Sequence, residues 1–234
     1  DQTMNYILYA GLKDVASKTH EYILWDDISK TKIASLPGSS YGGVYLYDGD
    51  FILQDGVSNN PPRWSPDDNR VAIIGPASEG RSDTDEIFAI TKTGEVQRLT
   101  YFASHFEKAK ISDLSWSPDG KSIAFWVMLE PSFYDLPQDT YQDIRLAIVN
   151  TETLEITYYC IMGDSIGPMN GRPSAEFFGK SIPAPIWSPD STQVVLESRY
   201  ASDKSRLVLL NLQDGTAVEI GQNIEPIGWM IGEP

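Results

Sequence analysis

Trp116-Ser117-Pro118-Asp119-Gly120 is the clearest copy of a short motif that the chain repeats. Near-copies are Trp64-Ser65-Pro66-Asp67-Asp68 and Trp187-Ser188-Pro189-Asp190-Ser191, and a worn fourth copy is Gly228-Trp229-Met230. Motifs that recur every few tens of residues indicate that one supersecondary unit is stacked several times. The repeat therefore sets the fold class before any single residue is interpreted.

A short apolar run, rich in β-branched and aromatic residues, follows each complete copy of the motif. The runs are residues 70–74, 122–126 and 193–197. They are too short for helices and are bounded by turn residues, so each predicts a buried strand. The Pro-Asp segment before each run supplies a turn, because proline presets φ and Asp and Gly tolerate the tight positions of a hairpin.

Two more strand-like segments, joined by a short turn, follow in each unit. They are 86–90 and 96–99, then 145–149 and 155–158, then 206–210 and 216–220. Each unit is therefore predicted to be four antiparallel strands, which is one blade of a β-propeller.

This order of motif, apolar run, loop and two further strands resembles the propeller repeat of TolB-like and WD-repeat-like proteins. Related blades occur in the propeller domains of prolyl-oligopeptidase-type and tricorn-type proteases. The resemblance covers roughly residues 62–231 and, more weakly, residues 4–36. It implies a β-propeller and no single function, because the family includes scaffolds, periplasmic partners and gating domains of enzymes.

The predicted architecture is an all-β propeller of about four blades in a single domain, residues 1–234. The N-terminal segment holds three strand-like runs and the C-terminus one, around 227–231, so pairing of the two ends would complete a blade and close the ring. The alternative is that the chain forms part of a larger propeller. The predicted blades are 1–61 (completed by 226–232), 62–112, 113–184 and 185–225.

Composition and charge narrow the class of protein. The 234 residues are 41% hydrophobic, enough for a sizeable core, and no apolar run approaches the roughly 20 residues of a membrane-spanning helix. A net charge of −15 argues against a nucleic-acid partner, whose phosphates need basic patches. Cys160 is the single cysteine, which excludes an internal disulfide. The first residue is Asp1 rather than Met, which a removed leader would explain, and we expect a periplasmic or extracellular protein.

The predicted insertions all fall at one end of the blades. In a propeller, the turns between strands one and two and between strands three and four lie on one face, and the other connections lie on the opposite face. Here the first set is short. The second set includes 75–85, 127–143 and 198–205 within blades, and 37–62, 100–113 and 160–185 between blades. Insertions gathered on one face often mark a binding surface, so this long-loop face is expected to bind a partner.

Aromatic side chains, a histidine, an arginine and an acid gather in these loops. Aromatic residues and Arg are frequent anchors of protein–protein interfaces, and we expect a protein or peptide partner. The alternative is that each ring packs its own loop onto a blade. The candidate binding residues are Tyr101, Phe102, His105, Phe106, Phe133, Tyr134, Asp135, Arg172, Phe177 and Phe178.

The repeated motif itself is interpreted as structural. Its tryptophan could line a central channel, but a repeated Trp more often packs between blades while its N–H finds an acceptor. The residues assigned to this structural role are Trp64, Trp116, Trp187, Trp229, Pro66, Pro118, Pro189, Asp67, Asp119 and Asp190.

The sequence predicts no catalytic residue, metal site or cofactor. Residues 163–167 match the GxSxG elbow, but prolines and glycine in 168–173 forbid the helix that such an elbow needs, and both histidines lie upstream. The carboxylates of Asp83, Asp85 and Glu86 do not fit a calcium loop and are expected to be solvated. One cysteine and two distant histidines make a zinc site improbable.

Three functions remain open at this point. The first is a non-enzymatic scaffold that binds a protein, or an exposed peptide or glycan, through the long-loop face. The second is the substrate-gating propeller domain of a larger serine-peptidase-type hydrolase. The third is a small propeller lyase or glycosidase, which needs two converging carboxylates. No such pair can be singled out in the sequence, and we favour the first.

Overall fold

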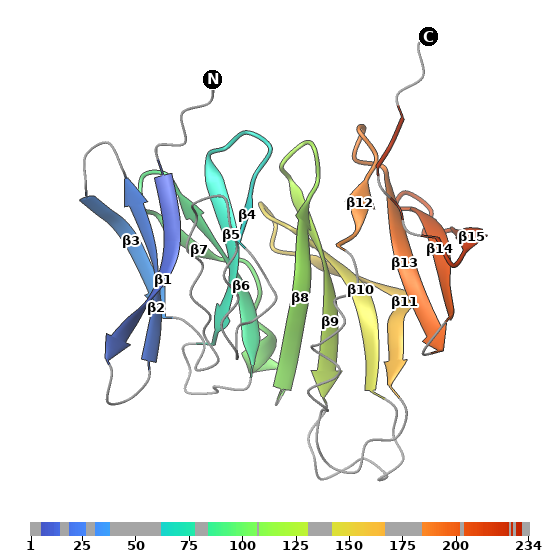
Figure 1. Ribbon diagram of the computed structural model, residues 1–234, viewed down its shortest axis with the longest axis horizontal. Helices are drawn as coiled ribbons and strands as arrows, with labels where there is room; N and C mark the ends of the chain where they lie inside the picture. Colours follow the sequence, from blue (N-terminus) through green and yellow to red (C-terminus); the bar gives the residue numbers. More distant parts are fainter. Residues whose placement is uncertain are drawn as a thin grey trace. The chain divides into compact units, whose positions relative to one another are not determined.

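The computed structural model is all-β and is drawn in Figure 1. It describes residues 6–14, 19–26, 31–37, 62–77, 84–106, 108–130, 142–166, 184–201, 204–224, 226 and 228–230. The chain divides into two compact units, residues 1–108 and 109–234, which are described one after the other. In the part of the chain described, no helix is long and apolar enough to cross a membrane.

The first unit holds a three-stranded and a four-stranded antiparallel sheet. The three-stranded sheet is β1 (Tyr6–Asp14), β2 (Thr19–Asp26) and β3 (Thr31–Pro37), in that order. The four-stranded sheet is β4 (Arg63–Trp64), β5 (Arg70–Pro76), β6 (Asp85–Thr91) and β7 (Val96–Arg98), followed by the 3-10 turn η1 (Phe102–Ser104). A small core of Ala34, Val71, Ile73 and Ile90 joins the two sheets.

The second unit is built from two four-stranded antiparallel sheets. The first is β8 (Lys108–Trp116), β9 (Ser122–Glu130), β10 (Gln142–Asn150) and β11 (Ile156–Ile166). The second is β12 (Ile186–Trp187), β13 (Gln193–Ala201), β14 (Lys204–Asn211) and β15 (Ala217–Gln222). Three four-stranded sheets in chain order confirm the predicted blade. Closure of a ring stays a prediction.

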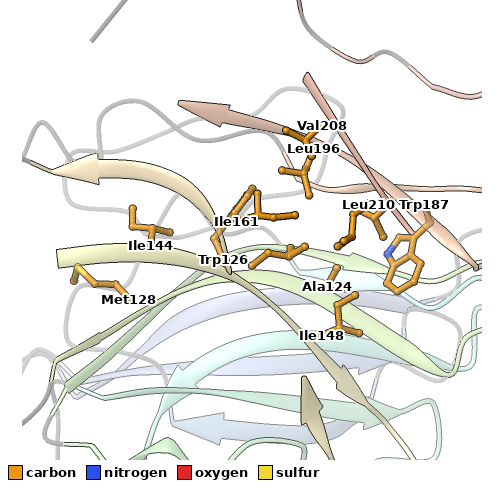
Figure 2. Packing of buried hydrophobic residues seen from close by; sticks show 12 residues of the cluster. Ala124, Trp126, Met128, Ile144, Ile148, Ile161, Trp187, Leu196, Val208 and Leu210 are labelled. Carbon is orange, nitrogen blue, oxygen red and sulfur yellow. The ribbon is translucent and has the colours of Figure 1, made fainter. Parts of the chain in front are cut away.

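The core of the second unit lies between its two sheets. Trp126 of β9 pairs with Leu146 of β10, so their side chains share one face. Val208 and Leu210 of β14 pack against this face from the other sheet. Figure 2 shows Trp126 and Ile161 of one sheet facing Leu196 and Val208 of the other. The alternation of apolar residues along the strands therefore produces the inter-sheet core directly.

The repeated motif forms the same hydrogen-bonded turn three times. In each copy, the serine hydroxyl donates to the aspartate two residues on and accepts the N–H of the residue that opens the next strand. The Ser–Asp distances are 2.5 Å for Ser65–Asp67, 2.6 Å for Ser117–Asp119 and 2.6 Å for Ser188–Asp190. The N–H donors are Arg70, Ser122 and Gln193. The motif is therefore a closed local turn that leads the chain into strand two.

These turns make the free energy of unfolding depend on pH. The hydroxyl of Ser65 holds the pKa of Asp67 below its ordinary value of 3.8, and the hydroxyl of Ser188 does the same for Asp190. A lowered pKa contributes stability while the carboxylate is ionised, and this contribution is lost as pH falls through the folded-state value. We therefore expect the free energy of unfolding to drop between about pH 5 and pH 1, and to drop less in Asp190→Asn.

The measurement is denaturant unfolding of both proteins over that pH range. Asp190→Asn is less stable at neutral pH, because it loses charge-assisted hydrogen bonds from the turn, but its stability should fall less steeply with acid. Ser188→Ala serves as the matched variant, since it keeps the carboxylate and removes its first donor. Parallel pH curves for wild type and Asp190→Asn would contradict the assignment.

The tryptophans of the motif make a second repeated contact. Trp187 Nε1 donates to the carbonyl of Ser115 at 3.0 Å, and Trp229 Nε1 donates to that of Ile186 at 3.3 Å. Each acceptor is the residue immediately before the motif tryptophan of the preceding copy. The worn copy at Trp229 thus repeats the contact made by Trp187. The described residues 228–230 are nevertheless not in a strand, contrary to the prediction, and Gly228 has φ of 152°, a conformation open to glycine.

Three of the loops are shorter in the structure than the sequence predicts, because the neighbouring strands extend into them. β9 and β10 leave only 131–141 between them, β13 and β14 leave 202–203, and β11 continues to Ile166. Ser165, the centre of the elbow-like match, therefore lies within a strand, opposite Asp143. Backbone pairing continues after the apolar pattern ends, since the ladder needs only N–H and C=O groups. Of the predicted insertion 37–62, residues 38–61 lie outside the described residues.

Candidate functional site

One described segment of the predicted long-loop face follows β7; it comprises residues 99–106 and is here called the aromatic loop. It leaves the fourth strand of its sheet and carries four of the predicted binding residues. Its backbone starts at a buried Leu99 and turns through η1. The loop is organised around one side chain, that of Glu86 in β6.

Glu86 is fully buried, with 0% of its surface exposed, and its carboxylate accepts three hydrogen bonds, one from Arg98 at the end of β7 and two from the aromatic loop. Arg98 Nη2 donates to Oε1 at 2.8 Å, and so does the backbone N–H of Ala103, also at 2.8 Å. The hydroxyl of Thr100 donates to Oε2 at 2.5 Å and accepts the N–H of Ile87 at 2.9 Å. A buried carboxylate with this many donors fixes the loop on the sheet.

Tyr101 is the residue that this arrangement presents to solvent. Its side chain is 47% exposed, and the guanidinium carbon of Arg98 lies 4.6 Å from the centre of its ring. Arg98 is itself held by Glu86 and, through Nε, by the carbonyl of Thr100 at 2.8 Å. The ring is therefore supported on one side by a cation with fixed geometry, which limits the rotamer freedom that a partner would have to freeze.

The other three predicted residues of this loop have different positions. Phe102 is buried, and its ring centroid lies 6.3 Å from that of the half-buried Phe106. Phe102 therefore packs the loop onto the sheet, which is the alternative stated above, and does not reach the surface. His105 is exposed. Of the four predicted residues, Tyr101 and His105 are therefore the exposed ones.

Six further candidates lie outside the described residues. They stay predictions, and they are Phe133, Tyr134, Asp135, Arg172, Phe177 and Phe178.

The structure corrects one prediction about charge. The sequence predicts that Glu86 is a solvated carboxylate, yet it lies in β6 and is completely buried against Arg98. Two features of the sequence could have indicated this burial. Glu86 begins the predicted strand Glu86–Ile90, and an arginine follows 12 residues later in the next predicted strand. No group of three or more His, Cys, Asp or Glu side chains suited to a metal ion occurs among the described residues.

Comparison with known proteins shows that the chain shares its fold with solved structures but does not assign it to a family. No protein-family model and no curated protein matches the chain. Among solved structures, dipeptidyl peptidase 4 from Porphyromonas gingivalis is similar at a TM-score of 0.53, with 12% sequence identity over 94% of this chain and 31% of that chain. TolB from Acinetobacter baumannii gives a TM-score of 0.46, with 16% identity over 94% of this chain and 52% of that chain.

A third similar structure is the β-propeller domain of the Trilobed protease from Pyrococcus furiosus. Its TM-score is 0.43, with 13% identity over 86% of this chain and 49% of that chain. The chain thus spans about half the length of the TolB and Trilobed-protease structures and under a third of the peptidase. At these identities the likeness concerns the fold, which is shared by proteins of different function.

Proposed function

We propose that the protein is a non-enzymatic binding propeller that holds a protein or peptide partner through the aromatic loop. The observation that carries this proposal is Tyr101, an exposed ring supported by Arg98, which in turn is fixed by the buried Glu86. Exposed aromatic side chains held in one conformation are the usual anchors of protein interfaces, because little side-chain entropy is lost on binding.

The chemistry of the chain supports a protein partner over nucleic acid. The net charge of −15 repels a phosphate backbone. The resemblance to TolB-like repeats supports a periplasmic or extracellular place of action, which belongs to the same proposal.

Tyr101→Ala is expected to weaken binding of the partner by about 30-fold, the effect of losing one interface hot spot. The experiment is a pull-down from extract of the source organism, followed by titration of the identified partner with purified wild-type and variant protein. The loop should stay folded, because Glu86 keeps its contacts to Thr100 and Ala103.

Tyr158→Ala is the matched control, since that tyrosine is 42% exposed on β11 and lies outside the aromatic loop. Equal binding by wild type and Tyr101→Ala would exclude the aromatic loop as the site. If the captured partner is a hydrolase catalytic domain, the gating-domain alternative replaces the scaffold.

A further inference from the structure

The second unit has an open groove between its two sheets, at the end where strands one and two and strands three and four are joined by short turns. It encloses about 320 Å³ and is lined by residues of β9, β10, β11 and β12 and of the four short turns. Ligand sites in proteins start at about 300 Å³, so the groove is suited to one side chain with its flanking backbone. This is the end of the sheets opposite to the long-loop end.

The walls of the groove are tied together by hydrogen bonds that cross between the sheets. The backbone N–H of Asp119 donates to Ser191 Oγ at 3.2 Å, which joins two motif turns. Trp187 lines the groove, and its Nε1 donates to the carbonyl of Ser115 at 3.0 Å. The groove is therefore formed before any ligand binds.

The floor comes from alternate residues along β11. Thr157 and Tyr159 share one face of the strand, and Glu155 precedes it in the same alternation. Thr157 pairs with Ile148, which belongs to the inter-sheet core, so these side chains point to the side on which the other sheet lies. Tyr159 is half-buried against that core.

The charged side chains that line the groove are both acidic. Asp119 and Glu155 contribute carboxylates, and no Lys, Arg or His is among the described residues that line the groove. Asp119 Oδ1 accepts from Ser117 Oγ at 2.6 Å and from the Lys121 N–H at 3.1 Å. Glu155 is exposed, and the turn is closed by its backbone, whose carbonyl accepts from Asn150 N at 2.9 Å, rather than by its carboxylate. Lys121 is exposed and is not a lining residue.

We propose that this groove binds the arginine side chain of a basic peptide segment, with Glu155 as the principal carboxylate partner and Tyr159 as the ring beside the guanidinium. Guanidinium is planar, stacks on aromatic rings and carries five donors in a fork that fits a carboxylate. The remaining donors find acceptors in the hydroxyls of Thr157 and Ser191. Burial raises the pKa of Tyr159 above its ordinary value of 10.0. The site is separate from the aromatic loop and does not depend on its function.

The test is a titration of isotope-labelled protein with the peptide acetyl-Gly-Arg-Gly-amide, followed by backbone amide chemical shifts. We expect shifts confined to the groove, around residues 155–159 and 191. The matched probe is the same peptide with citrulline, which keeps the shape and removes the charge, and it should bind about tenfold more weakly.

Glu155→Gln should reduce affinity for the arginine peptide by about the same factor. Glu152→Gln is the control variant, because Glu152 is exposed in the same turn and does not line the groove. Equal binding of the citrulline and arginine peptides would overturn the proposal. So would equal losses of affinity in Glu155→Gln and Glu152→Gln, because binding would then reflect general attraction to an acidic surface. Binding of a neutral disaccharide at the same amides, with no arginine effect, would also overturn it.

Discussion

Trp126→Ala is expected to lower the free energy of unfolding of the second unit by about 3–5 kcal/mol, the range for truncating a large buried aromatic side chain. Trp126 is 0% exposed and is among the largest fully buried side chains described. It lies in the middle of the inter-sheet core, beside Leu146 on the neighbouring strand. Alanine leaves a cavity that the two sheets cannot fill, because each is held by its own ladder. Denaturant unfolding followed by circular dichroism measures the loss.

Two further variants make the result specific. Val218→Ala removes an apolar side chain that is 57% exposed on β15, and should change stability by no more than about 0.5 kcal/mol. Trp126→Phe keeps an aromatic ring and should cost less than alanine, since it leaves a smaller cavity. If Trp126→Ala were no more damaging than Val218→Ala, the core would not lie where the structure places it.

The blades could be predicted because their signals are local. Residues 122–126 and 145–149 alternate or run apolar over the length of a strand, and Pro118-Asp119-Gly120 has the chemistry of a turn. Both segments are in strands, β9 and β10, and the turn is closed by the Ser117–Asp119 hydrogen bond. Each of these features depends on residues close in sequence, so the sequence pattern is enough.

Two features could not be predicted: where the strands end and that Glu86 and Arg98 form a buried ion pair. Both depend on spatial neighbours that the sequence pattern does not identify. β11 continues to Ile166 because β10 offers a backbone to pair with, although Gly163, Asp164 and Ser165 interrupt the apolar pattern there. Glu86 is buried because Arg98, Thr100 and the Ala103 N–H come together around it, up to 17 residues away in sequence. An acid at the start of a strand is more often solvated, so the sequence alone favours the wrong environment.

The groove at Glu155 could not be predicted from the sequence either. Its lining residues come from two sheets whose relative placement follows from core packing around Trp126 and Val208. The long loops are predicted to bind a partner because insertions are visible in the sequence, whereas short turns carry no such mark. Sites that arise between blades therefore need the packed structure, whereas sites on insertions are visible in the sequence.

Glu86→Ala is expected to cost about 3–5 kcal/mol in the first unit, because removing one partner of a buried ion pair leaves the other charge without compensation. Arg98 is 12% exposed on its side chain, so solvent recovers part of the loss and the lower end of this range is expected. The variant also leaves the N–H of Ala103 and the hydroxyl of Thr100 without their acceptor. Thermal unfolding measures the total effect.

Hydrogen exchange separates the role of Glu86 in the aromatic loop from its role in overall stability. In Glu86→Ala the amide of Ala103 should exchange much faster than that of Ile90, which is buried in β6 and paired with Val71 and Val96. The double variant Glu86→Ala/Arg98→Ala should lose less than the sum of the single losses, since neither charge then remains without its partner. Additive losses, together with unchanged exchange at Ala103, would show that the carboxylate does not hold the loop. The rigid presentation of Tyr101 would then need another cause, such as the hydrogen bond from Arg98 Nε to the carbonyl of Thr100.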